Sequence, residues 1–207
     1  TKHLASLAAR KASLASKTPE DAQAAKDAAV AEDAAYRVAA EAWKATADML
    51  QQAQDMLGAC DSAKAAPVRI AHSRALIRSG KIAEGVGELE GMLDTLSESG
   101  QEDSAIARDA REELATGYYY GARLMRVAGK PTEEWREVSG WSRQNFRYLA
   151  ETSGGAADGV AQPPSAVSSG DEAGEFQKNL ELVLNLEQSA QEDLLAKPLP
   201  KHGPSGN

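Results

Sequence analysis

The chain of 207 residues carries a formal net charge of −8 and a single cysteine, and only 5% of its residues are aromatic although 42% are hydrophobic. An acidic balance argues against a general nucleic-acid binder, and a lone cysteine excludes an internal disulfide and a cysteine metal cluster. No run of about 18 apolar residues is present, so we expect no membrane span in this chain.

Residues 1–17 are basic and amphipathic. The basic side chains are Lys2, Arg10, Lys11 and Lys17, and no acidic residue accompanies them. Leucines recur at helical spacing at Leu4, Leu7 and Leu14. We interpret this segment as a short helix with a solvated basic face; contact with an anionic lipid surface is the alternative.

A long helix is expected next. The stretch Thr18-Pro-Glu-Asp21 predicts a helix start, with an N-cap hydroxyl, proline at the first helical position and acids at the positive end of the dipole. No Gly or Pro follows before Gly58, which predicts a helix of about 39 residues, roughly 58 Å long. One seam recurs every seven residues: Ala22, Ala29, Tyr36, Trp43, Leu50 and Leu57. We expect a long packing helix rather than a true coiled coil, because polar residues interrupt the companion positions.

Two further helical pairs follow. Pro67 marks the start of the next element, and Val68–Ser79 is predicted to be a helix that ends at Gly80. A second apolar stripe, from Ile82 to Leu96, predicts the helix that follows. Gly85 lies near that stripe, where a neighbouring helix can need the space. A helix over about 104–128 then ends at Gly129-Lys-Pro131, and another runs from Thr132 to about Glu151. Residues 18–151 are therefore predicted to form one helical-hairpin domain.

The remainder is expected to be a tethered helix. Residues 152–174 have the composition of a flexible low-complexity linker, and 197–207 that of a disordered tail. Between them, residues 175–196 predict a C-terminal helix whose apolar face must dock on this chain or on another.

Two of these hairpins resemble tetratricopeptide repeats. Gly80 stands at the turn, and the positions around it that match the family are Ser73, Leu76, Ile82, Gly85 and Leu89. A second match centres on Gly129, with Ala122 and Met125 before it and Val138 and Trp141 after it. The two turn glycines are 49 residues apart, against a family period of about 34. The resemblance covers about 67–150 and implies stacked helical hairpins that bind another protein without catalysis.

The candidate site is an aromatic cluster in the second hairpin. Seven of the ten aromatic residues fall between positions 118 and 148, and Tyr, Trp and Arg dominate binding hot spots. The predicted partner-binding residues are Tyr118, Tyr119, Tyr120, Trp135, Trp141, Arg143 and Arg147. Three consecutive helix residues span about 200°, so at least one tyrosine should face away from the hairpin core. The favoured interpretation of the cluster is a well-packed core, and the partner-binding surface is the alternative.

The sequence therefore predicts an all-α fold of stacked antiparallel hairpins, a tetratricopeptide-like solenoid or bundle, with a long N-terminal helix. The expected function is a non-catalytic scaffold that binds another protein or peptide. A self-assembling structural protein, a homo-oligomer paired through the long and the tethered helices, is the second hypothesis, and an enzyme's accessory subunit is the third.

No catalytic residue, cofactor or metal is predicted, because His3, His72 and His202 lack metal-ligand spacing. The chain begins with Thr1, so either a signal or anchor has been removed or this is a shortened form. This favours an exported or membrane-tethered location, with the compartment itself unknown.

Overall fold

The computed structural model describes residues 18–57, 62–153 and 169–189, with side chains over 18–57, 65–153 and 173–189. Every element in this part of the chain is an α-helix, so the predicted all-α class is confirmed. The expectations for 1–17, for most of the 152–174 linker and for the 197–207 tail fall outside the described residues.

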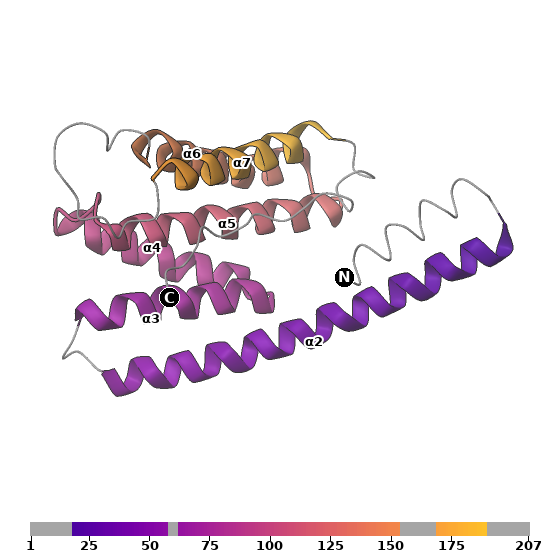
Figure 1. Cartoon of the computed structure of the whole chain (residues 1–207), viewed down its shortest axis with the longest axis horizontal. Helices are drawn as coiled ribbons and strands as arrows, with labels where there is room; N and C mark the ends of the chain where they lie inside the picture. Colours follow the sequence, from indigo (N-terminus) through magenta and orange to yellow (C-terminus); the bar gives the residue numbers. More distant parts are fainter. Residues whose placement is uncertain (1–17, 58–61, 154–168, 190–207) are drawn as a thin grey trace.

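The helices follow the predicted order (Figure 1). Their bounds are α2 (Pro19–Leu57), α3 (Ser62–Ser79), α4 (Ile82–Glu98), α5 (Ala105–Val127), α6 (Thr132–Ser153) and α7 (Ser169–Gln188). The predicted cap of α2 is present, because the Asp21 N–H donates to the Thr18 hydroxyl at 3.2 Å. Ser104 caps α5 in the same way, accepting from the Ala107 N–H at 3.1 Å.

Two helices begin earlier than the sequence predicted. α3 starts at Ser62 and carries Pro67 inside it. Alanine-rich sequence favours the helix there, and the exposed Pro67 costs one backbone hydrogen bond. α7 starts at Ser169, so the last residues of the predicted linker are helical.

Each of the three interhelical turns that the structure describes contains a glycine in the left-handed region. Gly80, Gly100 and Gly129 have φ values of 99°, 68° and 71°. After Gly80, the Lys81 N–H donates back to the Leu76 carbonyl at 3.0 Å, which satisfies a carbonyl at the end of α3. Only glycine adopts this conformation without strain, so these positions fix where the chain reverses.

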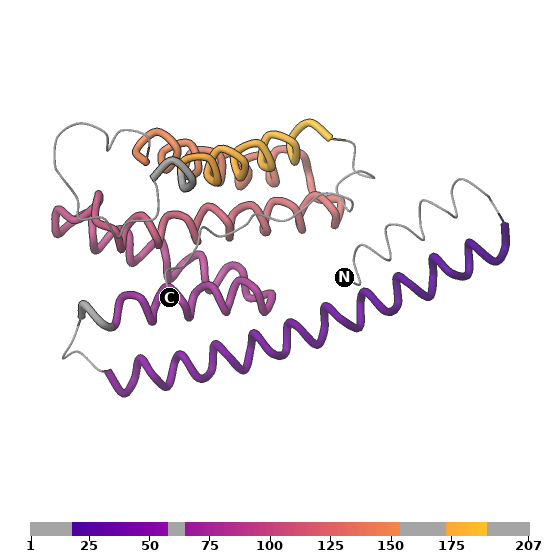
Figure 2. The backbone as a smooth tube through the Cα atoms, in the orientation of Figure 1, coloured from indigo at the N-terminus to yellow at the C-terminus, as the bar shows by residue number. Residues whose placement is uncertain are grey.

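α5 lies between α6 and α7 on one side and α3 and α4 on the other (Figure 2). A hydrophobic cluster lies on each of these two sides. On one side it packs with α6 and α7 through Tyr119, Phe146, Leu149, Val183 and Leu186, which are at most 2% exposed. On the other side Ala110, Leu114 and Tyr118 pack with α3 and α4. One helix therefore belongs to both halves of the core.

Two glycines permit the closest helix contacts. A Cβ on Gly85 would lie 2.5 Å from the Ser73 carbonyl oxygen of α3, and one on Gly117 would lie 2.8 Å from Val86 Cγ2 of α4. The expectation that Gly85 makes room for a neighbouring helix is confirmed.

α2 packs against α3 over its second half only. Trp43, Ala47 and Leu50 meet Ala75 and Leu76 of α3 there. The first half of α2 runs on past the end of α3 and away from the other described helices (Figure 1). This divergence opens the space described next.

Candidate functional site

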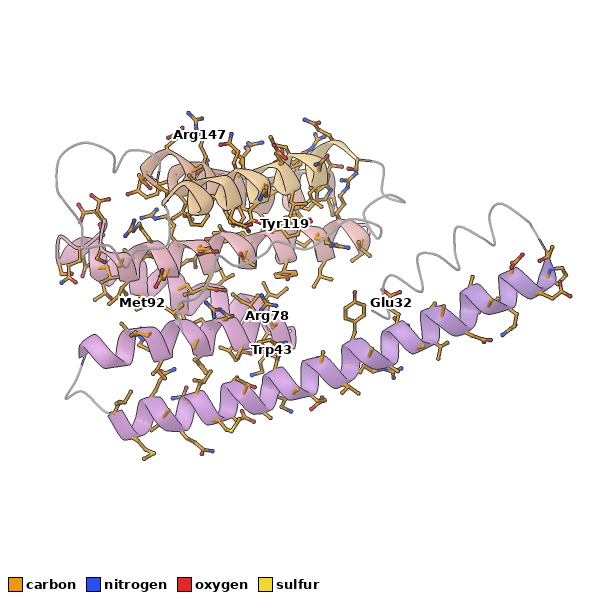
Figure 3. All side chains as sticks on the ribbon, in the orientation of Figure 1. Glu32, Trp43, Arg78, Met92, Tyr119 and Arg147 are labelled. Atoms are coloured by element: carbon orange, nitrogen blue, oxygen red, sulfur yellow. The ribbon has the colours of Figure 1, made fainter. Side chains whose placement is uncertain are left out.

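The three consecutive tyrosines of α5 face three different surroundings. Tyr119 points into the core between α5, α6 and α7 (Figure 3). Tyr118 faces α4, where its hydroxyl donates to the Glu90 carboxylate, and its ring centroid lies 5.3 Å from that of Trp141. Tyr120 is half-buried on the side of α5 that faces α2. Tyr120 is thus the tyrosine that faces away from the α5–α6 core.

The other predicted partner-binding residues are divided between buried and exposed positions. Trp135 is only 5% exposed, with the Arg126 guanidinium 4.8 Å from its ring centroid. Trp141 is 41% exposed. Arg147 projects outward from α6 (Figure 3) and makes an exposed ion pair with Glu151 one helical turn away.

The last helix docks on this same surface. Glu187 of α7 accepts from the Ser139 hydroxyl at 2.9 Å and pairs with Arg143 at 2.6 Å. Arg126 of α5 donates to the carbonyl oxygens of Leu186 and Ser189, at the C-terminal end of α7. A cation there satisfies carbonyls that lack a helical partner and faces the negative end of the dipole. Of the predicted partner-binding residues, Tyr119 therefore packs in the same cluster as α7 and Arg143 pairs with it, whereas Trp141 and Arg147 are exposed.

A second surface lies where α2 diverges from α5. A groove with a cavity volume of about 490 Å³ is bounded by α2 on one side, by the C-terminal end of α5 on the other and by the α3–α4 turn. We call it the α2–α5 groove. Tyr36 and Trp43 line it from α2, and Tyr120 and Leu124 line it from α5. Tyr36 and Leu124 are 51% and 56% exposed, so apolar side chains remain open to solvent here.

Opposite charges border this groove on its two sides. Glu32 and Asp33 stand on α2, whereas Arg78 and Arg123 come from α3 and α5. The Arg78 guanidinium lies 5.3 Å from the Trp43 ring centroid, and Figure 3 shows the two side chains directed toward each other. Burial raises the pKa of Tyr36, and the neighbouring Glu32 carboxylate adds to this effect. The groove therefore offers an apolar floor with a charge of each sign at its edges.

The sequence did not predict this groove. It placed Tyr36 and Trp43 on a continuous packing seam of the long helix. A signal is visible in retrospect, because two large aromatic residues stand in the middle of the seam, between alanines on one side and leucines on the other.

A half-buried cluster between α3 and α4 contains the serine, histidine and carboxylate of a hydrolytic triad, but not in the order that the chemistry needs. Glu88 lies between the other two: it accepts from the Ser73 hydroxyl at 2.7 Å, and its carboxylate lies 2.9 Å from His72 Nδ1. A nucleophilic serine needs the imidazole as its direct partner. This cluster instead joins α3 to α4 through a shared carboxylate.

Two further findings concern the described residues. Within them, no three His, Cys, Asp or Glu side chains gather as they would around a metal ion. None of the helices there combines the length and the apolar character that crossing a bilayer requires.

The chain was compared with protein-family models, with curated proteins and with solved structures, and none of the three comparisons gave a match.

Proposed function

We propose that this protein is a non-catalytic interaction module that binds a helical segment of a partner protein in the α2–α5 groove. The observation that carries the proposal is the groove itself, open to solvent and lined by aromatic and aliphatic side chains from two diverging helices. Helix-in-groove recognition uses such a surface, with apolar anchors at helical spacing.

The size of the groove sets the length of the segment it can take. The lining residues of α2 run from Glu32 to Trp43 and those of α5 from Tyr120 to Val127. At about 1.5 Å per residue these stretches span roughly 17 Å and 11 Å. A helical segment of two to three turns fits that length, with apolar side chains toward Tyr36 and Leu124 and both signs of charge at its borders.

The stacked hairpins support the same class of function. α3 contacts both α4 and α5, as the first helices of consecutive hairpins do in a stack. The resemblance of 67–150 to tetratricopeptide repeats implies a protein-binding scaffold of this kind. We therefore retain partner binding as the function and propose the α2–α5 groove as its principal surface, with Trp141 and Arg147 as a second exposed contact.

Site-specific photo-crosslinking tests this function. A photoreactive residue at position 124, inside the groove, should capture a partner peptide with apolar residues at helical spacing when the full chain is expressed in its native cells. The same probe at Val38 is the control, because Val38 is 72% exposed on the outer side of α2. Equal capture from both positions, or no capture from position 124, would contradict groove binding.

Self-assembly is a second candidate because of the outer face of α2. Val38, Met49 and Met56 are 72%, 62% and 87% exposed, and they lie on one side of this helix, opposite the groove. A second copy packed along this face would cover them. If that is the function, Met49→Lys converts a dimer to a monomer in light scattering, whereas Leu124→Ser leaves the mass unchanged.

A further inference from the structure

The charges of the α2–α5 groove differ along its length as well as between its sides. Its lining residues on α2 run from Glu32 and Asp33 at one end to Trp43 at the other, and Asp33 is exposed. These two ends are roughly 17 Å apart along the helix axis. Figure 3 shows Glu32 well separated along α2 from Trp43 and Arg78. We call the Glu32 end the outer end of the groove and the Trp43 end its inner end.

Arginine side chains border the inner end and the middle of the groove. The Arg78 guanidinium lies 5.3 Å from the Trp43 ring centroid, at the inner end. Burial raises the pKa of Tyr36 and of Tyr120, and the charge of Arg123 opposes the shift in both, so Arg123 stands between these two rings. A bound segment therefore meets acidic side chains at the outer end and arginines farther in.

This distribution of charge favours one direction for a bound helix. The N-terminal end of a helix carries a partial positive charge on its free N–H groups, and the C-terminal end carries a partial negative charge on its carbonyl groups. The first end is stabilised beside Asp33 and the second beside Arg78. The reverse orientation would place like charges together at both ends of the groove.

The protein holds the end of one of its own helices by the same chemistry. Arg126, three residues after Arg123 on α5, donates to the carbonyl oxygens of Leu186 and Ser189 at the C-terminal end of α7. An arginine that binds the last carbonyls of a helix also faces the negative end of its dipole. Within the groove, Arg78 and Arg123 offer such donors to a helix from another protein.

We infer that the helical segment bound in the α2–α5 groove lies parallel to α2, with its N-terminal end beside Asp33 and its C-terminal end toward Arg78. The inference rests on the proposed function of the groove and adds the direction and the charge pattern of the partner. That partner is an amphipathic helix with an acidic side chain in its last turn, where it meets the arginines. Its first turn lacks acidic side chains, because these would face Asp33.

The order of crosslinks along the partner tests the direction. α5 runs opposite to α2 (Figure 1), so Val127 lies nearer the outer end of the groove and Tyr120 nearer the inner end. p-Benzoylphenylalanine replaces one or the other in the full chain in its native cells, and mass spectrometry locates the crosslinked residue in the captured peptide. The residue captured from position 120 should lie about seven residues C-terminal to the residue captured from position 127.

The outcomes separate this inference from the proposed function. The opposite order would overturn the direction and leave groove binding intact, and so would the same partner residue captured from both positions. Capture from neither position would contradict the proposed function and the inference with it.

A charge reversal at the outer end gives a second test. Asp33→Lys places a positive charge beside the N-terminal end of the bound helix. Glu41→Lys makes the same change at an exposed residue of α2 outside the groove lining. Capture from position 120 should fall roughly threefold to tenfold in Asp33→Lys and stay at the wild-type level in Glu41→Lys. Unchanged or increased capture in Asp33→Lys would overturn the assigned direction.

Discussion

Gly85 and Gly87 stand two residues apart in α4 and meet opposite surroundings. A Cβ at Gly85 would lie 2.5 Å from a backbone oxygen of α3, whereas one at Gly87 would meet nothing within 4 Å. We expect Gly85→Ala to destabilise the protein by about 1–3 kcal/mol, because α3 and α4 must separate. Gly87→Ala should stabilise it by about 0.5–1 kcal/mol, because alanine favours the helix. Urea unfolding of both variants measures the two effects, and changes of the same sign would contradict this account.

The Tyr118 hydroxyl makes the stability of the protein depend on pH in the alkaline range. Burial raises the pKa of Tyr118, and the hydrogen bond to Glu90 and its negative charge raise it further. The folded protein therefore holds the proton more tightly than the unfolded chain, whose tyrosines titrate near pH 10. The stabilisation is complete below about pH 10 and is lost as the pH rises through the higher folded-state value.

Tyr118→Phe isolates this contribution. At pH 8 the variant should be about 1 kcal/mol less stable than wild type, because the hydrogen bond to Glu90 is missing. Above pH 10 the difference in unfolding free energy should shrink. Position 118 can ionise only in the wild-type protein, and its ionisation in the unfolded chain lowers the stability of the fold. Urea midpoints at pH 8 and pH 11 measure it, and a constant difference between the two would refute the assignment.

At the scale of elements, α7 is held to α5 and α6 by a buried apolar face and by charge contacts at its C-terminal end. Val183 is fully buried in the cluster that contains Tyr119 and Phe146, whereas Gln177 of the same helix is exposed. We expect Val183→Asp to release α7, because an unpaired carboxylate cannot remain in that cluster. Gln177→Asp is the matched control and should keep α7 in place.

Hydrogen exchange of residues 173–188 measures the release of α7. Protection should be lost in Val183→Asp and kept in Gln177→Asp, while amides of α3 and α4 stay protected in both. Full protection of α7 in Val183→Asp would show that this buried face does not hold the helix.

The helix bounds were predictable wherever a local signal sets them. The Thr18 and Ser104 hydroxyls accept from backbone N–H groups three residues away, and Gly80 and Gly129 adopt a left-handed backbone, so a local sequence pattern suffices. The start of α7 was missed because its Ser-Gly-Asp sequence resembles a loop. Tertiary contacts made farther along that helix override such weak local preferences.

The candidate sites depended on contacts that no local pattern contains. Arg143 and Glu187 are 44 residues apart, and Tyr119 shares one buried cluster with Val183, which lies more than 60 residues farther along the chain. The α2–α5 groove exists because α3 ends while α2 continues, although the seam of α2 runs on without a break. A sequence seam shows which face packs, but it does not show where along the helix the partner ends.

At the scale of the whole molecule, the helices around α5 bury large apolar clusters, whereas α2 and α3 bury a small one. The clusters on the two sides of α5 share that helix and contain most of the large buried side chains, so α3 to α6 should unfold together. The contact of α2 with α3 rests on a smaller cluster, whose buried members are Ala47, Ala75 and Leu76. Because apolar burial scales with the area removed from water, α2 should detach first.

Single-tryptophan variants separate these two events. A chain that keeps only Trp43 reports on α2, because that ring lies against Arg78 of α3. A chain that keeps only Trp141 reports on α5 and α6, because its ring contacts Tyr118. We expect the Trp43 fluorescence transition at a lower urea concentration than the Trp141 transition, which should coincide with the loss of helical circular dichroism. Coincident transitions for both tryptophans would show that α2 belongs to the same cooperative unit. The α2–α5 groove would then be a rigid surface, and not one that opens when α2 detaches.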